Sequence, residues 1–258
     1  MTATRGGTLR RLALLVLVSI AALQLYFIGR IALMAVVDPQ STTFQRSEAW
    51  RLALAPRSSA WRQRWTDYPA ISANLKRAVI AAEDSGFTEH SGVEWDALEK
   101  AWGRNERADA LAEHAAQRVP RRDAKLGAKG GTARPPKIVG GSTITQQLAK
   151  NLFLSGERNF VRKGQELVLS YTLEAILGKR RILEIYLNDV EWGEGVFGAG
   201  SAARRYFDVG AGELTAQQAA QLAVMLPAPK RFEQRPSSPY VVGRAATIVA
   251  RMGRVDVP

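Results

Sequence analysis

The 258-residue sequence contains no cysteine and only two histidines, His90 and His114. The absence of cysteine excludes a disulfide framework and a thiolate-ligated metal site. A metal site built on histidine would need both residues, and their sequence contexts do not suggest a pair. Acidic residues are also few, 24 against 36 basic ones, so the formal net charge is +12. We expect an anionic partner, which composition alone leaves open as nucleic acid, an anionic membrane surface or a phosphorylated substrate.

Acidic residues are missing altogether before Asp38, and this part of the chain contains a long apolar run. Residues 12–28 have only Ser19 and Gln24 as polar interruptions. They would form about 26 Å of helix, close to the thickness of a bilayer core. The apolar character resumes after Arg30, so we predict a transmembrane anchor over residues 12–37.

The charges around this run predict its orientation. Residues 1–11 carry three arginines and no acid, which places them in the cytoplasm and exports the rest of the chain. A signal peptide cleaved near residues 19–22 is the alternative. Residues 38–68 form a juxtamembrane segment rich in arginine and tryptophan, which suits a membrane interface or ordinary amphipathic packing.

Helical periodicity and capping residues dominate the remaining sequence, so the predicted fold class is mainly α. No alternating pattern indicates a β-strand. The expected helices have an apolar face at 71–82, a Thr143–Gln146 capping box, an Asn159 cap with a bend at Gly178, a segment at 201–207, a Thr215–Gln218 capping box with a stop at Pro227, and a last helix at 239–252. For the helix after Asn159 we expect Phe160, Val161, Leu167, Val168, Tyr171, Ile176 and Leu177 on the buried side.

Residues 140–166 are unusually dense in serine, threonine, glutamine and asparagine. On a helix, Gln146 and Lys150 would be neighbours one turn apart, as would Gln147 and Asn151. A solvated helix more often uses glutamate and lysine. This pattern favours a binding face that ends in a cation.

Two further segments stand out. Glu83 and Asp84 follow an apolar helical stretch, where a carboxylate is electrostatically unfavourable and its pKa tends to rise. General acid–base chemistry uses such groups, although a solvated acid at a helix end is the simpler interpretation. Residues 115–139 are basic and rich in glycine and proline, which predicts a flexible insertion suited to anionic lipid.

Four ordered motifs carry a resemblance to a known family. They are Glu83-Asp84-x-x-Phe87-x-x-His90-x-Gly92, Gly141-Ser142-Thr143-Ile144-Thr145-Gln146-Gln147-x-x-Lys150-Asn151, Arg162-Lys163-x-x-Glu166, and Lys179-x-x-Ile182-Leu183-Glu184-x-Tyr186-Leu187-Asn188. Over residues 70–255 the chain resembles glycosyltransferase family 51, the peptidoglycan glycosyltransferases. With one anchor and one catalytic domain at 69–258, it is similar to the monofunctional members.

This resemblance implies a lysozyme-like α-helical domain behind one N-terminal transmembrane helix. It also implies polymerisation of lipid II into glycan strands. The GlcNAc 4-hydroxyl of lipid II would attack the donor chain on undecaprenyl pyrophosphate, with inversion and formation of a β-1,4 bond. Bifunctional members add a transpeptidase with an S-x-x-K motif, which this sequence lacks, so no transpeptidase activity is expected.

The resemblance assigns roles to particular residues. Glu83 would be the general base, and Glu166 the second catalytic carboxylate, which orients cations or holds the pyrophosphate through a metal ion. The residues expected to bind substrate are Lys150, Arg158, Arg162, Ser142, Thr143, Gln146, Gln147 and Asn151. Those expected to shape the site are Asp84, Phe87 and Asn188. Lys163 is open between substrate contact and a solvated lysine.

Partners and location follow from the same resemblance. The expected partners are lipid II, lipid-linked glycan, the membrane and cell-wall synthesis proteins, with no nucleic acid. No cofactor is expected to be required, and a divalent cation (Mg or Mn) at the pyrophosphate is left open. The protein would be a single-pass protein of the inner (cytoplasmic) membrane with a periplasmic catalytic domain.

Three other functions compete with this one. A lytic transglycosylase or lysozyme-like hydrolase would share the fold and a catalytic glutamate, but would not need the basic cluster of Lys150, Arg158 and Arg162. A non-catalytic scaffold that binds lipid II would not need both Glu83 and Glu166. Nucleic-acid binding rests on charge alone and conflicts with export of the basic domain.

Overall fold

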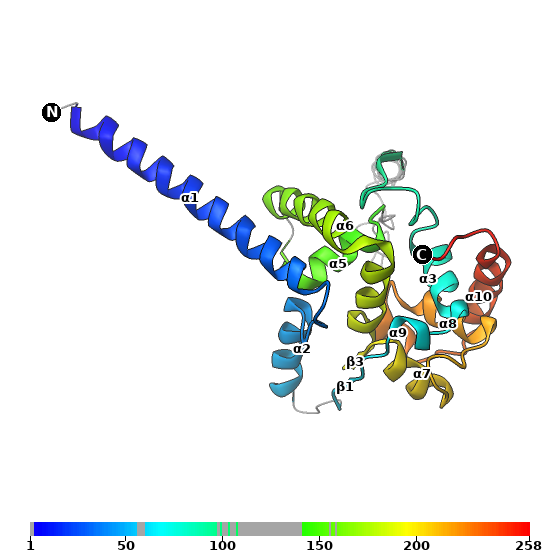
Figure 1. Cartoon of the computed structure of the whole chain (residues 1–258). Helices are drawn as coiled ribbons and strands as arrows, with labels where there is room; N and C mark the ends of the chain where they lie inside the picture. The colour runs from blue at the N-terminus through cyan, green and yellow to red at the C-terminus, as the bar shows by residue number, and fades with distance from the viewer. Residues whose placement is uncertain are drawn as a thin grey trace, which may run out of the picture. The chain divides into compact units, whose positions relative to one another are not determined.

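The computed structural model describes residues 3–55, 60–96, 99, 103, 107, 141–154, 156–157 and 159–258. The chain forms two compact units, one of Met1–Val93 with Ile144–Pro258 and one of Glu94–Thr143. The first unit carries the fold described here (Figure 1). The predicted flexible insertion at 115–139 lies outside the described residues.

The first unit is mainly helical, as predicted. Its helices are α1 (Ala3–Leu33), α2 (Thr43–Ala53), the short 3-10 helix η1 (Tyr68–Ala70), α3 (Ala73–Glu83), α5 (Ile144–Phe153), α6 (Phe160–Asp189), α7 (Ala199–Phe207), α8 (Ala216–Met225), α9 (Pro229–Phe232) and α10 (Pro239–Met252).

Helix α1 contains the predicted anchor. Gly7–Leu33 is long and apolar enough to cross a membrane, with a mean hydropathy of 2.4 in its most apolar window. The helix continues through Gly29 and Arg30 without a break and ends at Leu33, four residues before the predicted end. Arg30 donates a hydrogen bond to the Tyr26 hydroxyl one turn back, at 3.2 Å.

The C-terminal end of α1 packs into the helical domain (Figure 1). Ile31, in the last turn of α1, and Met34, just beyond the helix, are buried in the core. Phe27 meets Phe153 edge to face, with ring centroids 5.3 Å apart. The side chains of Gln24 and Gln165 exchange two hydrogen bonds, at 2.9 and 3.1 Å. Helix α1 therefore contacts both α5 and α6.

Helix α2 is joined to the same domain through a buried amide. Gln45 completes a capping box with Thr42 at the start of α2. Its Nε2 also donates to the main-chain oxygen of Asp189 at 3.3 Å and to Asp189 Oδ1 at 3.4 Å. Burial raises the pKa of Asp189 to about 8, so this carboxyl is mainly protonated at neutral pH and leaves no full charge in the core.

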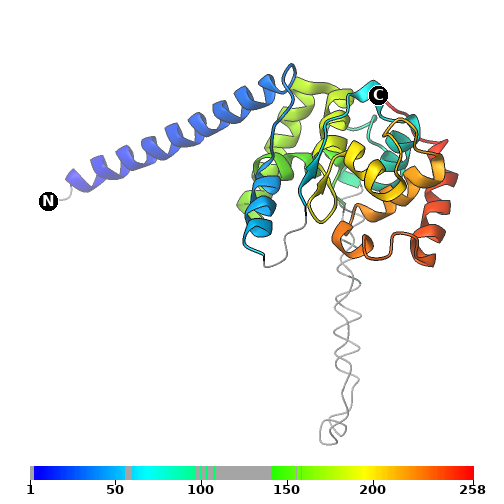
Figure 2. The same cartoon turned by 90° about the horizontal axis from the view of Figure 1, so that it is seen from below.

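Helices α3, α8 and α10 pack together and build the core beside α6 (Figure 2). Ser72 caps α3 by accepting a hydrogen bond from the Leu75 amide, and Leu75, Ala78, Val79 and Ile80 then point inward. Burying each of these larger aliphatic side chains contributes roughly 1.5–3 kcal/mol. The end of α3 is fixed by this packing, and Glu83 is its last residue.

Helix α6 follows the predicted cap and bend but not the predicted burial. Asn159 Oδ1 accepts from the Arg162 amide at 2.7 Å, and Gly178 interrupts the helix at φ 69°. Phe160 and Val161, expected on the buried side, are 92% and 84% exposed. Nothing in the described part of the first unit covers Phe160 and Val161, and this apolar helix end faces outward. Val168 and Tyr171, also expected on the buried side, are exposed as well.

A small sheet lies where the sequence indicated no strand. Strand β3 (Val196–Phe197) pairs with β1 (Arg62–Gln63) in parallel and with β2 (Glu191–Gly193) in antiparallel. Strands of two or three residues are too short to show an alternating pattern, so the sequence could not reveal them. Gly195 and Gly198, both at positive φ, make the tight turns around β3.

We predict that the contact between α1 and α6 forms in the membrane-bound protein. The variant Gln24→Cys/Gln165→Cys should cross-link efficiently with a short thiol–thiol reagent, because the two native side chains are hydrogen-bonded. The chain has no cysteine, so background labelling is absent. The matched control is Leu23→Cys/Gln165→Cys, because Leu23 is 47% exposed. Equal yields for the two pairs would contradict the contact.

Candidate active site

Glu83 stands at one end of a chain of hydrogen bonds that links three helices. At the end of α3 its Oε2 accepts from Gln147 Nε2 of α5 at 2.9 Å. Gln147 Oε1 in turn accepts from the Tyr186 hydroxyl of α6 at 3.0 Å. Tyr186 is 1% exposed and Gln147 is partly buried. Gln147 therefore orients the Glu83 carboxylate directly, and Tyr186 orients Gln147.

The environment of Glu83 favours its protonated form. Burial raises the pKa of this carboxyl above its ordinary value, and the nearby Asp84 carboxylate adds to the rise. The hydrogen bond from Gln147 and the charge of Lys150 act in the opposite direction but are outweighed. A carboxylate with a raised pKa is a stronger base.

Asp84 holds the end of α3 against the start of α5. Its Oδ2 accepts from the Ile144 amide at 2.9 Å, and its Oδ1 lies 2.8 Å from His90 Nε2. The Gly92 amide donates to His90 Nδ1 at 3.0 Å, so the ring proton is on Nε2 and points at Asp84. The side chain of Asp84 is fully buried. Its role in shaping the site stays a prediction from the resemblance.

Phe87 lies fully buried beneath the same loop. Lys179 Nζ sits 4.6 Å from the centre of its ring, a cation–π contact. Lys179 also binds Glu174 Oε1 at 2.7 Å, and the Thr145 hydroxyl donates to that same oxygen at 2.6 Å. The loop after α3 is thus joined to α5 and to both sides of the bend at Gly178 in α6.

Glu166 forms a second cluster at the N-terminal end of α6. It is 3% exposed, and its Oε2 accepts from Arg162 Nη1 at 3.0 Å. Lys163 Nζ binds the other carboxylate oxygen. Lys163, which the sequence left open, is therefore half of a pair of cations aligned by one buried carboxylate. Helix α5, which carries Gln147 and Lys150, packs against α6.

The other predicted substrate-binding residues are placed differently. Lys150 is exposed and Asn151 is half-buried on α5, as a binding face requires. Gln146 is only 1% exposed, so in this structure it belongs to the interior and not to the predicted polar face. Ser142 and Thr143 belong to the second unit. Arg158 lies outside the described residues.

Asn188 is buried but serves another part of the fold. Its Nδ2 donates to the main-chain oxygen of Thr66 at 2.9 Å, and its Oδ1 accepts from the Thr66 amide at 2.8 Å. It therefore fixes the segment that enters η1 and has no contact with Glu83 or Glu166 among the described residues. Its predicted role in shaping the catalytic site stays a prediction.

Sequence reasoning missed three residues that the structure ties to the site. Tyr186 ends the hydrogen-bond chain behind Glu83, and Glu174 with Lys179 joins α5 to α6. Tyr186 and Lys179 stand in the fourth motif, which was the available signal. Glu174 lies outside all four motifs, so no local pattern could have found it.

Comparison with known proteins identifies the family. The family described as "Transglycosylase" matches residues 52–115 and 128–253. The chain belongs to the transglycosylase family. It is also similar to two proteins named biosynthetic peptidoglycan transglycosylase. The one from Burkholderia thailandensis is 48% identical over 237 residues, 92% of this chain and 82% of the relative. The one from Paraburkholderia phytofirmans is 45% identical over 265 residues and the full length of both.

This transglycosylase is therefore a peptidoglycan glycosyltransferase with a lysozyme-like helical domain. Its family match spans all four motifs quoted above, including Glu83 and Glu166. The match also begins at residue 52, after the anchor and most of α2. Helix α1 and most of α2 therefore lie outside the family match, although both contact the transglycosylase domain in this structure.

We predict that Asp84 holds the site together, so Asp84→Ala should destabilise the protein. The change leaves the buried Ile144 amide and His90 ring without an acceptor, which costs about 2–3 kcal/mol. Thermal unfolding of the purified protein measures the loss. The control is Glu89→Ala in the same loop, where the side chain is exposed. An unfolding temperature equal for both variants would refute the assigned role.

Proposed function

We propose that the chain polymerises lipid II into glycan strands by inverting glycosyl transfer. The donor is a growing chain on undecaprenyl pyrophosphate, and the GlcNAc 4-hydroxyl of the acceptor lipid II attacks its anomeric carbon. The C–O bond to pyrophosphate breaks as the β-1,4 bond forms, and the hydroxyl proton passes to a base. The observation that carries this proposal is the oriented, high-pKa carboxylate of Glu83 next to the charge of Lys150.

Glu83 is the general base in this mechanism. A sugar hydroxyl is a poor nucleophile, so a positioned acceptor must take its proton as the bond forms. Burial raises the pKa of Glu83, which strengthens it as a base. Burial also raises the pKa of Tyr186 well above its ordinary value, so its hydroxyl keeps its proton and goes on donating to Gln147.

The leaving pyrophosphate needs positive charge, which α5 and α6 supply. Lys150 is exposed on α5, and Arg162 and Lys163 are held in place by Glu166 on α6. Arg158 is proposed for the same role because it lies between Lys150 and Arg162 in the sequence. Charges fixed before the reaction stabilise the developing anion without reorganisation. The part of Glu166 is therefore to align cations rather than to transfer a proton.

A divalent cation at the pyrophosphate is a separate question. Both carboxylate oxygens of Glu166 are already bound to cations. Within the described residues, no group of three or more His, Asp or Glu is arranged to hold a metal ion. We propose that Mg or Mn, if the reaction uses one, binds at the pyrophosphate oxygens. Polymerisation with and without a chelator tests this.

The proposed location is the inner membrane, with the N-terminus in the cytoplasm and the catalytic domain in the periplasm. Helix α1 is compatible with a single-pass anchor. Phe160 and Val161 expose apolar surface at the end of α6 that carries Arg162 and Glu166. Lipid II is itself fixed in the membrane, so a polymerase must work at that surface. No transpeptidase activity is proposed, and cell-wall synthesis proteins are the proposed partners.

Glu83→Gln tests the proposed reaction directly. The variant keeps the size of the side chain and loses its basicity, so polymerisation of labelled lipid II should fall by about 10²–10⁴-fold or more. The unfolding temperature should stay close to that of the unmodified protein. Near-normal turnover would refute the assignment of Glu83 as the general base. Cleavage of preformed glycan without polymer formation would instead favour a hydrolase, and neither activity would favour a scaffold.

Gln147→Met should change the pH dependence of polymerisation. The hydrogen bond from Gln147 lowers the pKa of Glu83, so its removal raises that pKa further. A general base acts when deprotonated, so the rate is lost as pH falls through its pKa. The acidic limb of the rate profile should therefore move to higher pH. Tyr186→Phe, which removes only the outer bond, should move it less. An unmoved or lowered limb contradicts the interpretation.

A further inference from the structure

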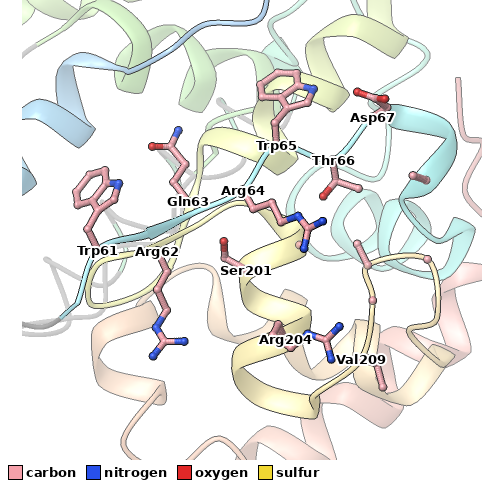
Figure 3. Close-up of a pocket in the computed structure, with 15 residues that line it drawn as sticks. Trp61, Arg62, Gln63, Arg64, Trp65, Thr66, Asp67, Ser201, Arg204 and Val209 are labelled. Carbon is pink, nitrogen blue, oxygen red and sulfur yellow. The ribbon is translucent and has the colours of Figure 1, made fainter.

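A pocket is lined by residues outside the catalytic clusters. It has a volume of about 720 Å³ and opens between the segment from Trp61 to Ala70, helix α7 and the turn at 209–212 (Figure 3). Its volume is in the range of small-ligand sites in proteins. The lining residues include none of Glu83, Gln147, Lys150 or Glu166. The mechanism proposed above leaves this pocket unused.

The charge of the pocket is strongly positive. Arg62, Arg64 and Arg204 line it, against a single acid, Asp67. Within the described part of the chain, no carboxylate binds the side chains of Arg62 and Arg64. Among the described residues, Arg204 pairs with Asp208, the residue that follows α7, and the side chains of that pair are 59% and 88% exposed. Such an exposed pair contributes little and leaves Arg204 available.

The side chains around the pocket come from opposite walls. In Figure 3, Arg64 extends from the segment after β1, and Arg204 and Ser201 come from α7. The hydroxyl groups of Ser201 and Thr66 add hydrogen-bonding capacity. Trp61 is 40% exposed and stacks on Phe197, with ring centroids 4.5 Å apart. An aromatic face, two hydroxyls and guanidinium groups therefore surround one space.

The pocket is held open by the fold. Asn188 binds both the amide and the main-chain oxygen of Thr66, which fixes one wall to α6. A Cβ at Gly200 would come within 2.6 Å of Thr66 Oγ1, and one at Gly212 within 3.0 Å of the Ala70 oxygen. The two walls thus approach each other as closely as glycine allows. A ligand would meet arginines carried by a preformed frame, so less ordering is lost on binding.

We propose that this pocket binds the carboxylate-bearing peptide of a peptidoglycan strand, together with a sugar of that strand. This inference rests on the proposed function. Guanidinium groups pair with carboxylates through two parallel hydrogen bonds, which suits Arg64 and Arg204. Asp67 is suited to an amino group of the same peptide. A pocket with three arginines and one acid thus fits a ligand that carries more carboxylates than amines.

Such a site would hold the product strand by its sugars and peptides, which the reaction does not change. Sugars and peptides recur along the polymer, whereas the pyrophosphate occurs only at its lipid-linked end. Binding here would therefore slow the release of the strand between additions. The expected consequence of losing the site is shorter polymer at an unchanged rate of bond formation.

The test is calorimetric titration of the full-length protein in detergent with a soluble disaccharide-peptide fragment that has neither lipid nor pyrophosphate. Arg64→Ala/Arg204→Ala should weaken binding by at least about tenfold, since two charge-assisted contacts are lost. Arg205→Ala is the matched control, because Arg205 is the exposed neighbour on α7 and does not line the pocket. Arg64 and Arg204 are both exposed, so the double variant, the control and the unmodified protein should have the same unfolding temperature.

Further arms identify the ligand chemistry. The same fragment with amidated carboxylates should bind as weakly as the double variant does. Inorganic pyrophosphate should not compete; equal binding of pyrophosphate would overturn the peptide assignment. Fragment binding that is absent, or equal in the double variant and the control, would overturn the site.

Polymerisation separates this inference from the proposed function. The double variant should join lipid II at a normal initial rate and yield shorter strands. An unmodified protein that binds the fragment but makes no polymer would refute the proposed function and leave the pocket standing. A protein that polymerises, with strand length unaffected by the double substitution, would refute the retention role alone.

Discussion

The site depends on one buried carboxylate that does not itself react. Asp84 accepts a hydrogen bond from the first amide of α5 and another from the ring of His90. A helix start has amides without partners inside the helix, so an anion is stable there. By occupying that position, Asp84 brings α5 to the end of α3. Its neighbour Glu83 is thereby placed within reach of Gln147.

The two glutamates of the site differ because their neighbours differ. Glu83 is bound by neutral groups in a partly buried position, and burial outweighs the nearby positive charge, so its pKa rises. Glu166 is more deeply buried but has Arg162 and Lys163 on its two oxygens. One carboxylate is thus kept basic, and the other is committed to holding cations. Divergent environments of this kind let two identical side chains take different roles.

Much of the local structure was predictable, because it depends on residues close together in the sequence. The Asn159 cap, the Thr215–Gln218 capping box and the bend at Gly178 are examples. The prediction failed where exposure depended on distant partners. The helical pattern predicted that Phe160 and Val161 are buried, yet no described residue of the first unit covers them. The polar pattern predicted Gln146 on the surface, yet its side chain is buried.

The sequence by itself determined the helical class, the family through its four motifs, and the identity of the residues that carry the charge. These properties need only short-range order: caps, periodicity and motif spacing. Only the tertiary structure decided which of those residues meet. It placed Tyr186 behind Gln147, joined Glu174 to Thr145 and Lys179, and joined Asn188 to Thr66. Contacts between helices depend on how their buried faces pack, and no local pattern in one helix records the residues of another.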